Sequence, residues 1–326
     1  MSDILEFVRF QQVETNGLTL RAALAGEGPL VIMVHGWPES WYSWRHQFRP
    51  LVEAGYTACA IDVRGYGGSD KPHPAEAYAM AEITADVAGL VPALGHEQAI
   101  LLGHDWGAPI VWNTALLHPE RVRAVAGLSV PYLGAGPAPF IDIVKQIYTA
   151  NGRFFYQVYF QDEGVAEAEF EADIRSALRK VYYSSCGDVP DGLVPADKKH
   201  GDAMLTGLTD PDPFPAWLSD ADIDYFVGEF ERSGLRGPLN RYRNHRRDWE
   251  LLSAQPDQVL KQPALFVAGS RDVVLRMVPG RDMLELMQPF YADLRGQHLI
   301  EGIGHWTQQE APETVNRHLL DWLGGL

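Results

Sequence analysis

The sequence predicts an α/β fold with eight strands, in which a mostly parallel sheet is flanked by helices and interrupted by an all-helical insertion. Short apolar runs alternate with segments of helical periodicity at both ends of the chain. The strand signal disappears between about residues 131 and 255. These boundaries divide the 326 residues into a sheet-containing core, 1–130 and 256–326, and a helical lid (cap) domain, 131–255.

The expected strands are identified by composition and by their flanking turns. Residues 5–13 and 18–24 flank Asn16-Gly17, the strongest short signal for an antiparallel hairpin. The later runs are apolar throughout, which is typical of parallel strands buried on both faces. They are 30–34, 57–61, 99–102, 122–130, 264–268 and a short last strand at 299–300.

The expected helices follow from apolar spacing and capping residues. Residues 41–52 have helical spacing with Ser40 as an N-cap. In the lid, apolar residues recur at i, i+3, i+4 and i+7 from Ile223 to Phe230, with Ser219 or Asp220 before this helix and Gly234 after it. Proline suits a first helical position, so another helix can start at Pro238. Further helices are expected at 80–94, from the strand 99–102 to His118, and at 314–322.

Composition restricts the classes of partner. The net charge of −16, from 27 Lys and Arg against 43 Asp and Glu, argues against nucleic acid or an anionic membrane. No apolar run approaches the ~18 residues of a membrane span, and the N-terminus lacks the features of a signal peptide. Cys59 and Cys186 are expected to be free thiols in a reducing compartment. We therefore expect a cytoplasmic protein, with a homodimer as one possible assembly.

One turn of the chain carries a candidate nucleophile. Residues 103–107 (GHDWG) lie between an apolar run and a helical pattern, with small residues on both sides, as in a nucleophile elbow. Its central residue is Asp105 instead of the familiar serine. A carboxylate is already ionised at neutral pH, and its attack on a saturated carbon makes an alkyl ester of the enzyme. Asp105 alone would also suit a helix N-cap.

Two further residues complete a candidate triad. Asp272 and His305 each follow a predicted strand, and carboxyl ends of parallel strands meet at one edge of a sheet. The order nucleophile, acid, histidine is that of the α/β-hydrolases. His305 can activate water to hydrolyse the ester, with Asp272 orienting its ring. The backbone N–H groups of Trp106 and Trp37 are expected to form the oxyanion hole.

Over nearly its whole length the chain resembles α/β-hydrolase-fold epoxide hydrolases, particularly the hydrolase domain of the soluble type. The similarity lies in residues 35–40 (HGWPES), 103–107, 304–308 (GHWTQ) and 156–161 (YQVYFQ). The resemblance implies an α/β-hydrolase fold and an enzyme that converts a small apolar epoxide to a vicinal diol.

The resemblance also implies two lid tyrosines that hold and protonate the epoxide oxygen. By motif these are Tyr156 and Tyr242, although spacing alone does not distinguish them from Tyr159 or Tyr225. A phenol with a pKa near 10 stays protonated at neutral pH and can donate to the opening ring. The expected substrate pocket comprises Trp37, Pro38, Trp106, Phe155, Tyr159 and Trp306.

The same scaffold leaves other functions open. Haloacid dehalogenases carry arginines after the nucleophile, whereas residues 106–109 (WGAP) contain no cation. Some haloalkane dehalogenases place the acid after the strand 122–130, where Ser129 offers no carboxylate. A non-catalytic protein that binds small molecules remains a third possibility.

Other features are expected to be structural. The chain has no metal-type His/Cys spacing and no dinucleotide fingerprint in context, so no metal or cofactor is expected. His104 is expected to pack beside the nucleophile and His35 to brace the oxyanion loop. The basic run Arg241, Arg243, Arg246 and Arg247 is expected to form a solvated helix face.

Overall fold

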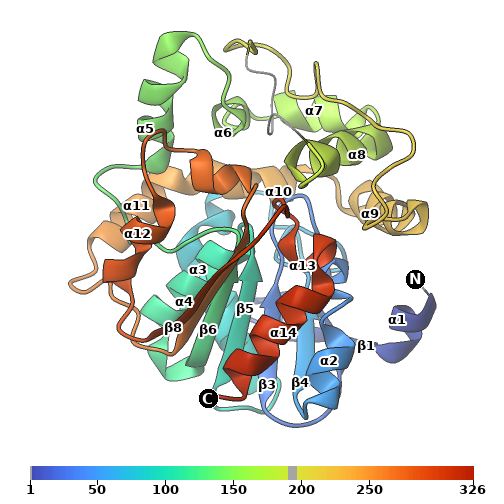
Figure 1. The fold of residues 1–326 in the computed structure, drawn as a ribbon, viewed down its shortest axis with the longest axis vertical. Coiled ribbons are helices and arrows are strands. Elements are labelled where there is room, and N and C mark those ends of the chain that lie inside the picture. Colours follow the sequence, from blue (N-terminus) through green and yellow to red (C-terminus); the bar gives the residue numbers. More distant parts are fainter. Residues whose placement is uncertain (1, 190–196) are drawn as a thin grey trace.

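The computed structural model describes residues 2–189 and 197–326 and contains an eight-stranded sheet (Figure 1). The strand order is β1-β2-β4-β3-β5-β6-β7-β8. Pairing is antiparallel for β1 with β2 and for β2 with β4, and it is parallel for all other neighbours. The predicted mostly parallel sheet is therefore confirmed. The strands are β1 (Arg9–Thr15), β2 (Leu18–Ala25), β3 (Leu30–Val34), β4 (Thr57–Ile61), β5 (Ala99–His104), β6 (Val122–Leu128), β7 (Ala264–Gly269) and β8 (Leu294–Ile300).

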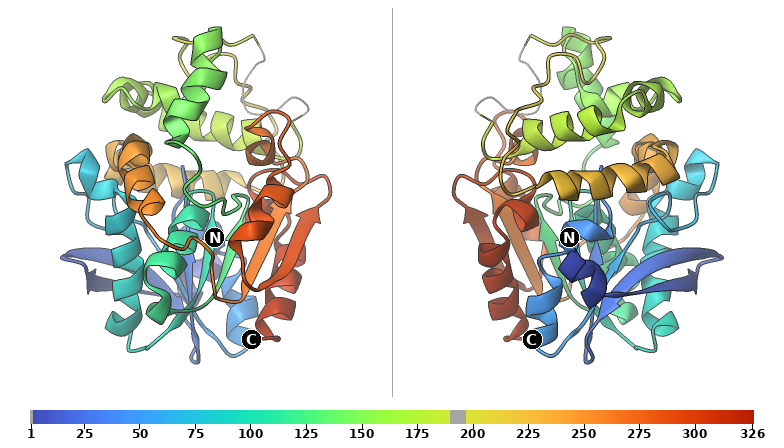
Figure 2. Two further views of the ribbon diagram at one scale, coloured as in Figure 1. Left: turned by 90° about the vertical axis from the view of Figure 1, so that its left-hand side faces the viewer. Right: turned by 90° about the vertical axis from the view of Figure 1, so that its right-hand side faces the viewer.

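Helices cover both faces of the sheet. Figure 2 shows the sheet between two layers, with α3 (Met80–Ala93) and α4 (Gly107–Leu117) opposite α2 (Phe48–Glu53) and α14 (Pro312–Leu323). Because both faces are covered, β3 and β5 are buried along their whole length. Shorter helical elements fill the connections: α1 (Ser2–Phe7), η1 (Trp41–Trp44), η2 (Ala75–Tyr78), η3 (Pro119–Arg121), η6 (Val273–Arg276), α12 (Met283–Met287), η7 (Gln288–Phe290) and α13 (Thr307–Glu310).

The regular elements described between β6 and β7 are all helices, and they lie above the carboxyl ends of the strands (Figure 1). We call the chain between these two strands the inserted segment. Its helix α9 (Asp220–Ser233) begins at a capping box formed by Ser219 and ends at Gly234, as predicted. The other elements are α5 (Phe140–Ile147), η4 (Thr149–Asn151), α6 (Tyr156–Tyr159), α7 (Val165–Glu171), α8 (Ile174–Ser185), α10 (Arg236–Asn240), η5 (Arg241–Asn244) and α11 (His245–Ser253).

Partly buried polar contacts attach the inserted segment to the core. Arg21 in β2 contacts Glu229 in α9 at 2.6 Å. The Tyr42 hydroxyl in η1 donates to Asp222, also in α9, at 2.7 Å. Both carboxylates belong to one helix, so α9 is one of the elements that hold the inserted segment over the sheet.

Four predicted boundaries were wrong. Residues 2–7 form a helix, and β1 begins only at Arg9. The apolar residues before Arg9 pack against the core from this helix, so they do not need a strand to be buried. The expected helix 41–52 is divided into η1 and α2, although Ser40 does cap η1. The last strand is longer than predicted, because this edge strand is only partly buried and carries polar residues. Helix α10 begins at Arg236, two positions before Pro238.

The predicted hairpin turn and the predicted free cysteines agree with the structure. Asn16 and Gly17 join β1 to β2 with φ of 46° and 75°, the conformation that the two-residue hairpin requires. Both cysteines are free and buried. Across the described residues, no helix combines the length and apolar character that a bilayer span needs.

Candidate active site

Asp105 occupies a sharp turn between β5 and α4. Its φ of 49° lies in the left-handed region, where a non-glycine residue is strained. The neighbouring glycines are required by close backbone approach. A Cβ at Gly103 would lie 2.2 Å from the Gly107 carbonyl oxygen, and one at Gly107 would lie 1.9 Å from the Val34 carbonyl oxygen. The small residues of the elbow therefore let the turn sit tightly against β3.

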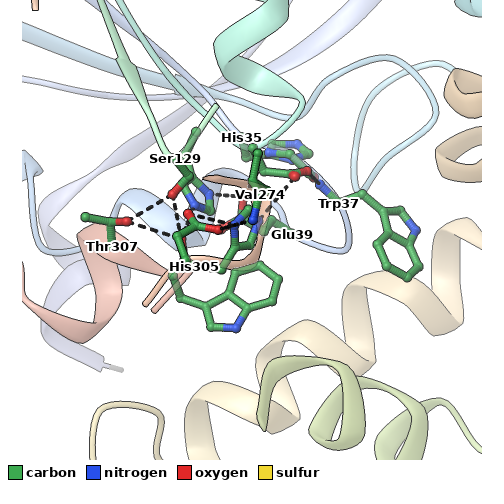
Figure 3. A network of polar contacts seen from close by, with 12 residues as sticks. His35, Trp37, Glu39, Ser129, Val274, His305 and Thr307 are labelled. Atoms are coloured by element: carbon green, nitrogen blue, oxygen red, sulfur yellow. Dashed lines mark hydrogen bonds and ion pairs between the residues drawn. The ribbon is translucent and has the colours of Figure 1, made fainter. Parts of the chain in front are cut away.

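The structure brings the three predicted residues of the triad together at the carboxyl edge of the sheet. His305 Nε2 lies 3.2 Å from Asp105 Oδ2. On its other side, His305 Nδ1 lies 3.1 and 3.2 Å from the two carboxylate oxygens of Asp272. Asp272 is fully buried, and its Oδ1 also accepts a hydrogen bond from Val274 N at 2.9 Å. One imidazole therefore bridges two carboxylates (Figure 3).

The electrostatics of this bridge favour a protonated His305. Burial of the ring opposes its charge, but the adjacent charges and hydrogen bonds of Asp272 and Asp105 outweigh burial and raise the pKa of His305 well above its ordinary value. The protonated ring can donate from both nitrogens at once. Removal of the negative charge on Asp105 would remove part of this stabilisation and lower the pKa of His305.

One of the two expected oxyanion-hole donors already contacts the carboxylate. Trp37 N–H donates to Asp105 Oδ1 at 2.8 Å. This contact leaves Oδ2 on the side of His305. The backbone N–H of Trp106 stays a prediction for the second donor.

A buried polar network supports the site and includes Glu39, whose role the sequence analysis did not identify (Figure 3). Glu39 Oε2 accepts from Gly36 N–H and contacts His104 Nδ1, each at 2.8 Å. His104 Nε2 donates to the His305 carbonyl oxygen at 2.7 Å. The charge of His104 helps to lower the pKa of Glu39 to about 2, although burial alone would raise it. This network ties the loop of residues 35–40, called the oxyanion loop, to the loop that carries His305. The motif at residues 35–40 was its only signal in the sequence.

Two hydroxyl groups and a second histidine complete the support. Ser129, with φ of 70°, donates to the His305 carbonyl oxygen at 2.8 Å and contacts Thr307 Oγ1 at 3.0 Å. His35 Nε2 accepts from Val63 N–H at 3.1 Å, so it braces the oxyanion loop as expected. The residue after β6 therefore fixes the histidine backbone, and the carboxylate that faces the ring comes from Asp272.

The two tyrosines expected from the lid motif line one cavity with Asp105 and His305. The rings of Tyr156 and Tyr242 lie 6.0 Å apart, from centroid to centroid. Burial is the main cause that raises the pKa of each phenol above its ordinary value, and the negative charge of Asp105 adds to it. Both therefore stay protonated. The other candidates lie elsewhere: the Tyr159 hydroxyl donates to Glu169 at 2.8 Å, and the Tyr225 hydroxyl accepts from the Trp41 indole at 2.8 Å.

The cavity itself is small and mostly apolar. Its volume is about 30 Å³, and Trp37 and Trp306 belong to its lining as predicted. The sequence analysis missed six lining residues, because nothing in the local sequence shows that these small or apolar side chains face a cavity. They are Val181, Ser185, Met204, Val273, Val274 and Met277.

Four residues expected in the pocket do not line this cavity. The Pro38 carbonyl accepts from the Tyr182 hydroxyl at 2.7 Å. Phe155 packs on Tyr148, with ring centroids 4.7 Å apart. Tyr159 contacts Glu169, as described above. Trp106 packs against Arg241, whose guanidinium carbon lies 4.7 Å from the centroid of the Trp106 ring.

The basic run is not the solvated face that was expected. Arg241 is buried against Trp106, forms an ion pair with Asp248 and donates to the Tyr78 carbonyl. Arg243 pairs with Glu167 at 2.8 Å. Only the later part of the run is exposed, as at Arg246. Within the part of the chain that the structure describes, no three His, Cys, Asp or Glu side chains are grouped as metal ligands would be.

Comparison with known proteins gives a consistent set of relatives. A family model described as the alpha/beta hydrolase fold matches residues 29–312. Epoxide hydrolase B of Mycobacterium tuberculosis is 42% identical, over 92% of this chain and 92% of its own. Epoxide hydrolase A of the same organism is 41% identical, over 96% and 97%. A solved structure of an epoxide hydrolase from an endophytic Streptomyces superposes with a TM-score of 0.92 at 44% identity, covering 98% of this chain and 96% of that one.

Proposed function

This chain belongs to the epoxide hydrolases of the α/β-hydrolase fold, and we propose that it converts apolar epoxides to vicinal diols through an ester on Asp105. The single observation that supports this route best is the pair of contacts on one carboxylate. Trp37 N–H holds Asp105 Oδ1, while Oδ2 lies 3.2 Å from His305 Nε2. One oxygen is thus held by the oxyanion loop, and the other is the attacking atom.

In the first step, Asp105 Oδ2 attacks an epoxide carbon and the carbon–oxygen bond of the ring breaks. An alkoxide is a poor leaving group, so a proton from Tyr156 or Tyr242 must reach the ring oxygen as that bond breaks. A halide would need no such proton. Two buried, protonated phenols that share a cavity with the nucleophile therefore favour an epoxide over a haloalkane.

In the second step, water hydrolyses the ester. Once Asp105 is a neutral ester, the pKa of His305 falls and the ring gives up its proton, while the phenolate regains one. Neutral His305 then takes a proton from water, and the hydroxide adds to the Asp105 Cγ. Negative charge grows on Oδ1, which Trp37 N–H stabilises. When the ester bond breaks, the departing alkoxide takes the proton of the new carboxyl group, which restores Asp105 as a carboxylate.

The inserted segment would serve as the lid of this site. It supplies Tyr156 and Tyr242, and Met204 and Val181 add apolar surface around the nucleophile. These lid side chains and the nucleophile enclose the cavity between them.

A single turnover in heavy-oxygen water tests the route. With enzyme in excess over styrene oxide, the new oxygen is expected in Asp105 and not in the first molecule of diol. Mass spectrometry of the peptide that contains Asp105 and of the diol reads both positions. Label that appears directly in the first diol would refute the ester. Measuring halide release from a chloroalkane in parallel separates the epoxide route from dehalogenation.

A further inference from the structure

One buried amide beside Tyr156 has no role in the mechanism above. Gln157 follows Tyr156 in α6, and its Nε2 donates to the Tyr156 phenol oxygen at 2.8 Å. The Gln157 side chain is only 6% exposed, and its Oε1 has no partner among the described residues. A buried acceptor without a partner costs free energy, so this orientation of the amide calls for a physical reason.

The reason lies in the direction of the phenol proton. A phenol oxygen can accept at its lone pairs but has only one proton to donate. Because Gln157 Nε2 donates to this oxygen, the Tyr156 proton is left for another acceptor in the cavity shared with Asp105. If the amide were reversed, Oε1 would capture the proton. As the phenol passes its proton to the substrate, charge grows on its oxygen, and an N–H donor to a charged atom is stronger than one to a neutral atom.

A second glutamine fixes the backbone around this pair. Gln161 Nε2 donates to the Gln157 carbonyl at 2.7 Å and to the Tyr242 carbonyl at 2.9 Å. One amide therefore joins the two segments that carry the tyrosines. Gln157 is held within a turn whose position is set relative to Tyr242.

We propose that Gln157 is a positioning residue for epoxide opening, which directs the Tyr156 proton toward the ring oxygen and stabilises the phenolate that forms. The inference rests on the proposed function, because it requires Tyr156 to act as an acid. Its contribution should be larger in the transition state than in the substrate complex, as catalysis requires.

The test measures alkylation alone. Full-length protein is mixed with styrene oxide, and the rate constant for the increase in intact enzyme mass is followed by rapid quench. Gln157→Leu removes the donor and should slow alkylation by about tenfold to a hundredfold, the range for a hydrogen bond to a charged group. Gln157→Glu should be slower still near pH ~7, because its carboxylate captures the phenol proton. Its rate relative to wild type should recover as the pH falls and the carboxyl group becomes a donor.

Two controls separate positioning from packing. In a Tyr156→Phe background, Gln157→Leu should have no further effect, whereas in a Tyr242→Phe background its effect should persist. Gln262 is a matched glutamine, since it is buried, its Nε2 donates to the Ala115 carbonyl at 2.9 Å, and its Oε1 has no partner within residues 2–189 and 197–326. It lies just before β7, at the opposite edge of the sheet from the site, so Gln262→Leu should alkylate at the wild-type rate.

Several results would overturn the inference. They are a wild-type rate for Gln157→Leu, an equal loss with and without Tyr156, or a Gln157→Glu defect that does not change with pH. If Gln157→Leu fails to fold, Gln157→Asn gives the same comparison, because its side chain keeps the amide but is one methylene too short to reach the Tyr156 oxygen. An unchanged rate in the single Tyr156→Phe variant would instead refute the role of Tyr156 in the proposed function, so the two failures are distinguishable.

Discussion

A single methyl group at Gly36 should displace Asp105, the proposed nucleophile. Gly36 lies in the loop after β3, and a Cβ added there would lie 2.3 Å from Asp105 Oδ1 and 2.4 Å from Asp105 Cβ. Real Cβ atoms essentially never approach another heavy atom within 3.0 Å. Gly36 N–H also donates to buried Glu39, which resists movement of the loop. Because Asp105 Cβ is fixed to its backbone, both the turn that carries Asp105 and its carboxylate must move.

The size of the effect follows from this displacement. Asp105 Oδ1 must withdraw by roughly 0.7 Å, from 2.3 Å to the 3.0 Å limit. It then loses the geometry of its 2.8 Å hydrogen bond from Trp37 N–H. A misplacement of about 1 Å can cost a hundredfold in rate, or about 2.7 kcal/mol of barrier. We expect Gly36→Ala to lower kcat/KM by roughly that factor.

The assay is diol release from styrene oxide, with the thermal midpoint measured in parallel to show that the variant folds. Gly228→Ala is the control, because it lies in α9 and its Cβ would find only Arg232 Nη1, at an ordinary 3.7 Å. The control should keep the wild-type kcat/KM. A folded Gly36→Ala variant with wild-type kcat/KM would show that activity does not depend on the position of Asp105, the proposed nucleophile.

Four further predictions test other groups. Asp105→Asn should abolish turnover, and diol formation by this variant, free of wild-type enzyme, would refute the nucleophile. His305→Gln should still open the ring but should hydrolyse the ester about 10²–10⁴-fold more slowly, leaving an adduct visible by intact mass; untouched substrate would show that His305 acts earlier. Tyr156→Phe with Tyr242→Phe should stop ring opening, and a harmless double variant would contradict the acid role. Burial and then the charge of Arg241 lower the pKa of His245 to about 3 in the folded protein. In the unfolded chain the ring has its ordinary pKa near 6.5, so as the pH falls below about 6.5 the unfolded state takes up a proton and the folded protein loses stability. Between pH ~7 and ~5 this protonation should lower the free energy of unfolding by about 2 kcal/mol. Urea titrations of His245→Gln should show a loss that is smaller by this amount. A variant with the same pH dependence as wild type would contradict the prediction.

The sequence by itself determined the number and places of the strands, the elbow turn and the three residues of the candidate triad. Strands buried on both faces must be apolar throughout, so the runs at β3, β5 and β7 were recognisable without partners. Elbow geometry needs small neighbours, which made Asp105 stand out between two glycines. Parallel strands end at one edge, so Asp272 and His305 could be placed beside it from chain order alone. Each of these inferences depends on a pattern within one segment: an apolar run, a turn with small neighbours, or a residue directly after its own strand.

Only the tertiary structure decided which side chains face each other across segments. Spacing could not separate Tyr156 from Tyr159, because both lie on one short helix and only the fold turns Tyr156 toward Asp105. It could not show that Arg241 is buried, since a cation reaches the interior only when a distant partner such as Asp248 meets it there. Nor could it place Gln157 on the Tyr156 oxygen. Such contacts depend on how helices cross above the sheet, and local periodicity carries no information about crossing geometry.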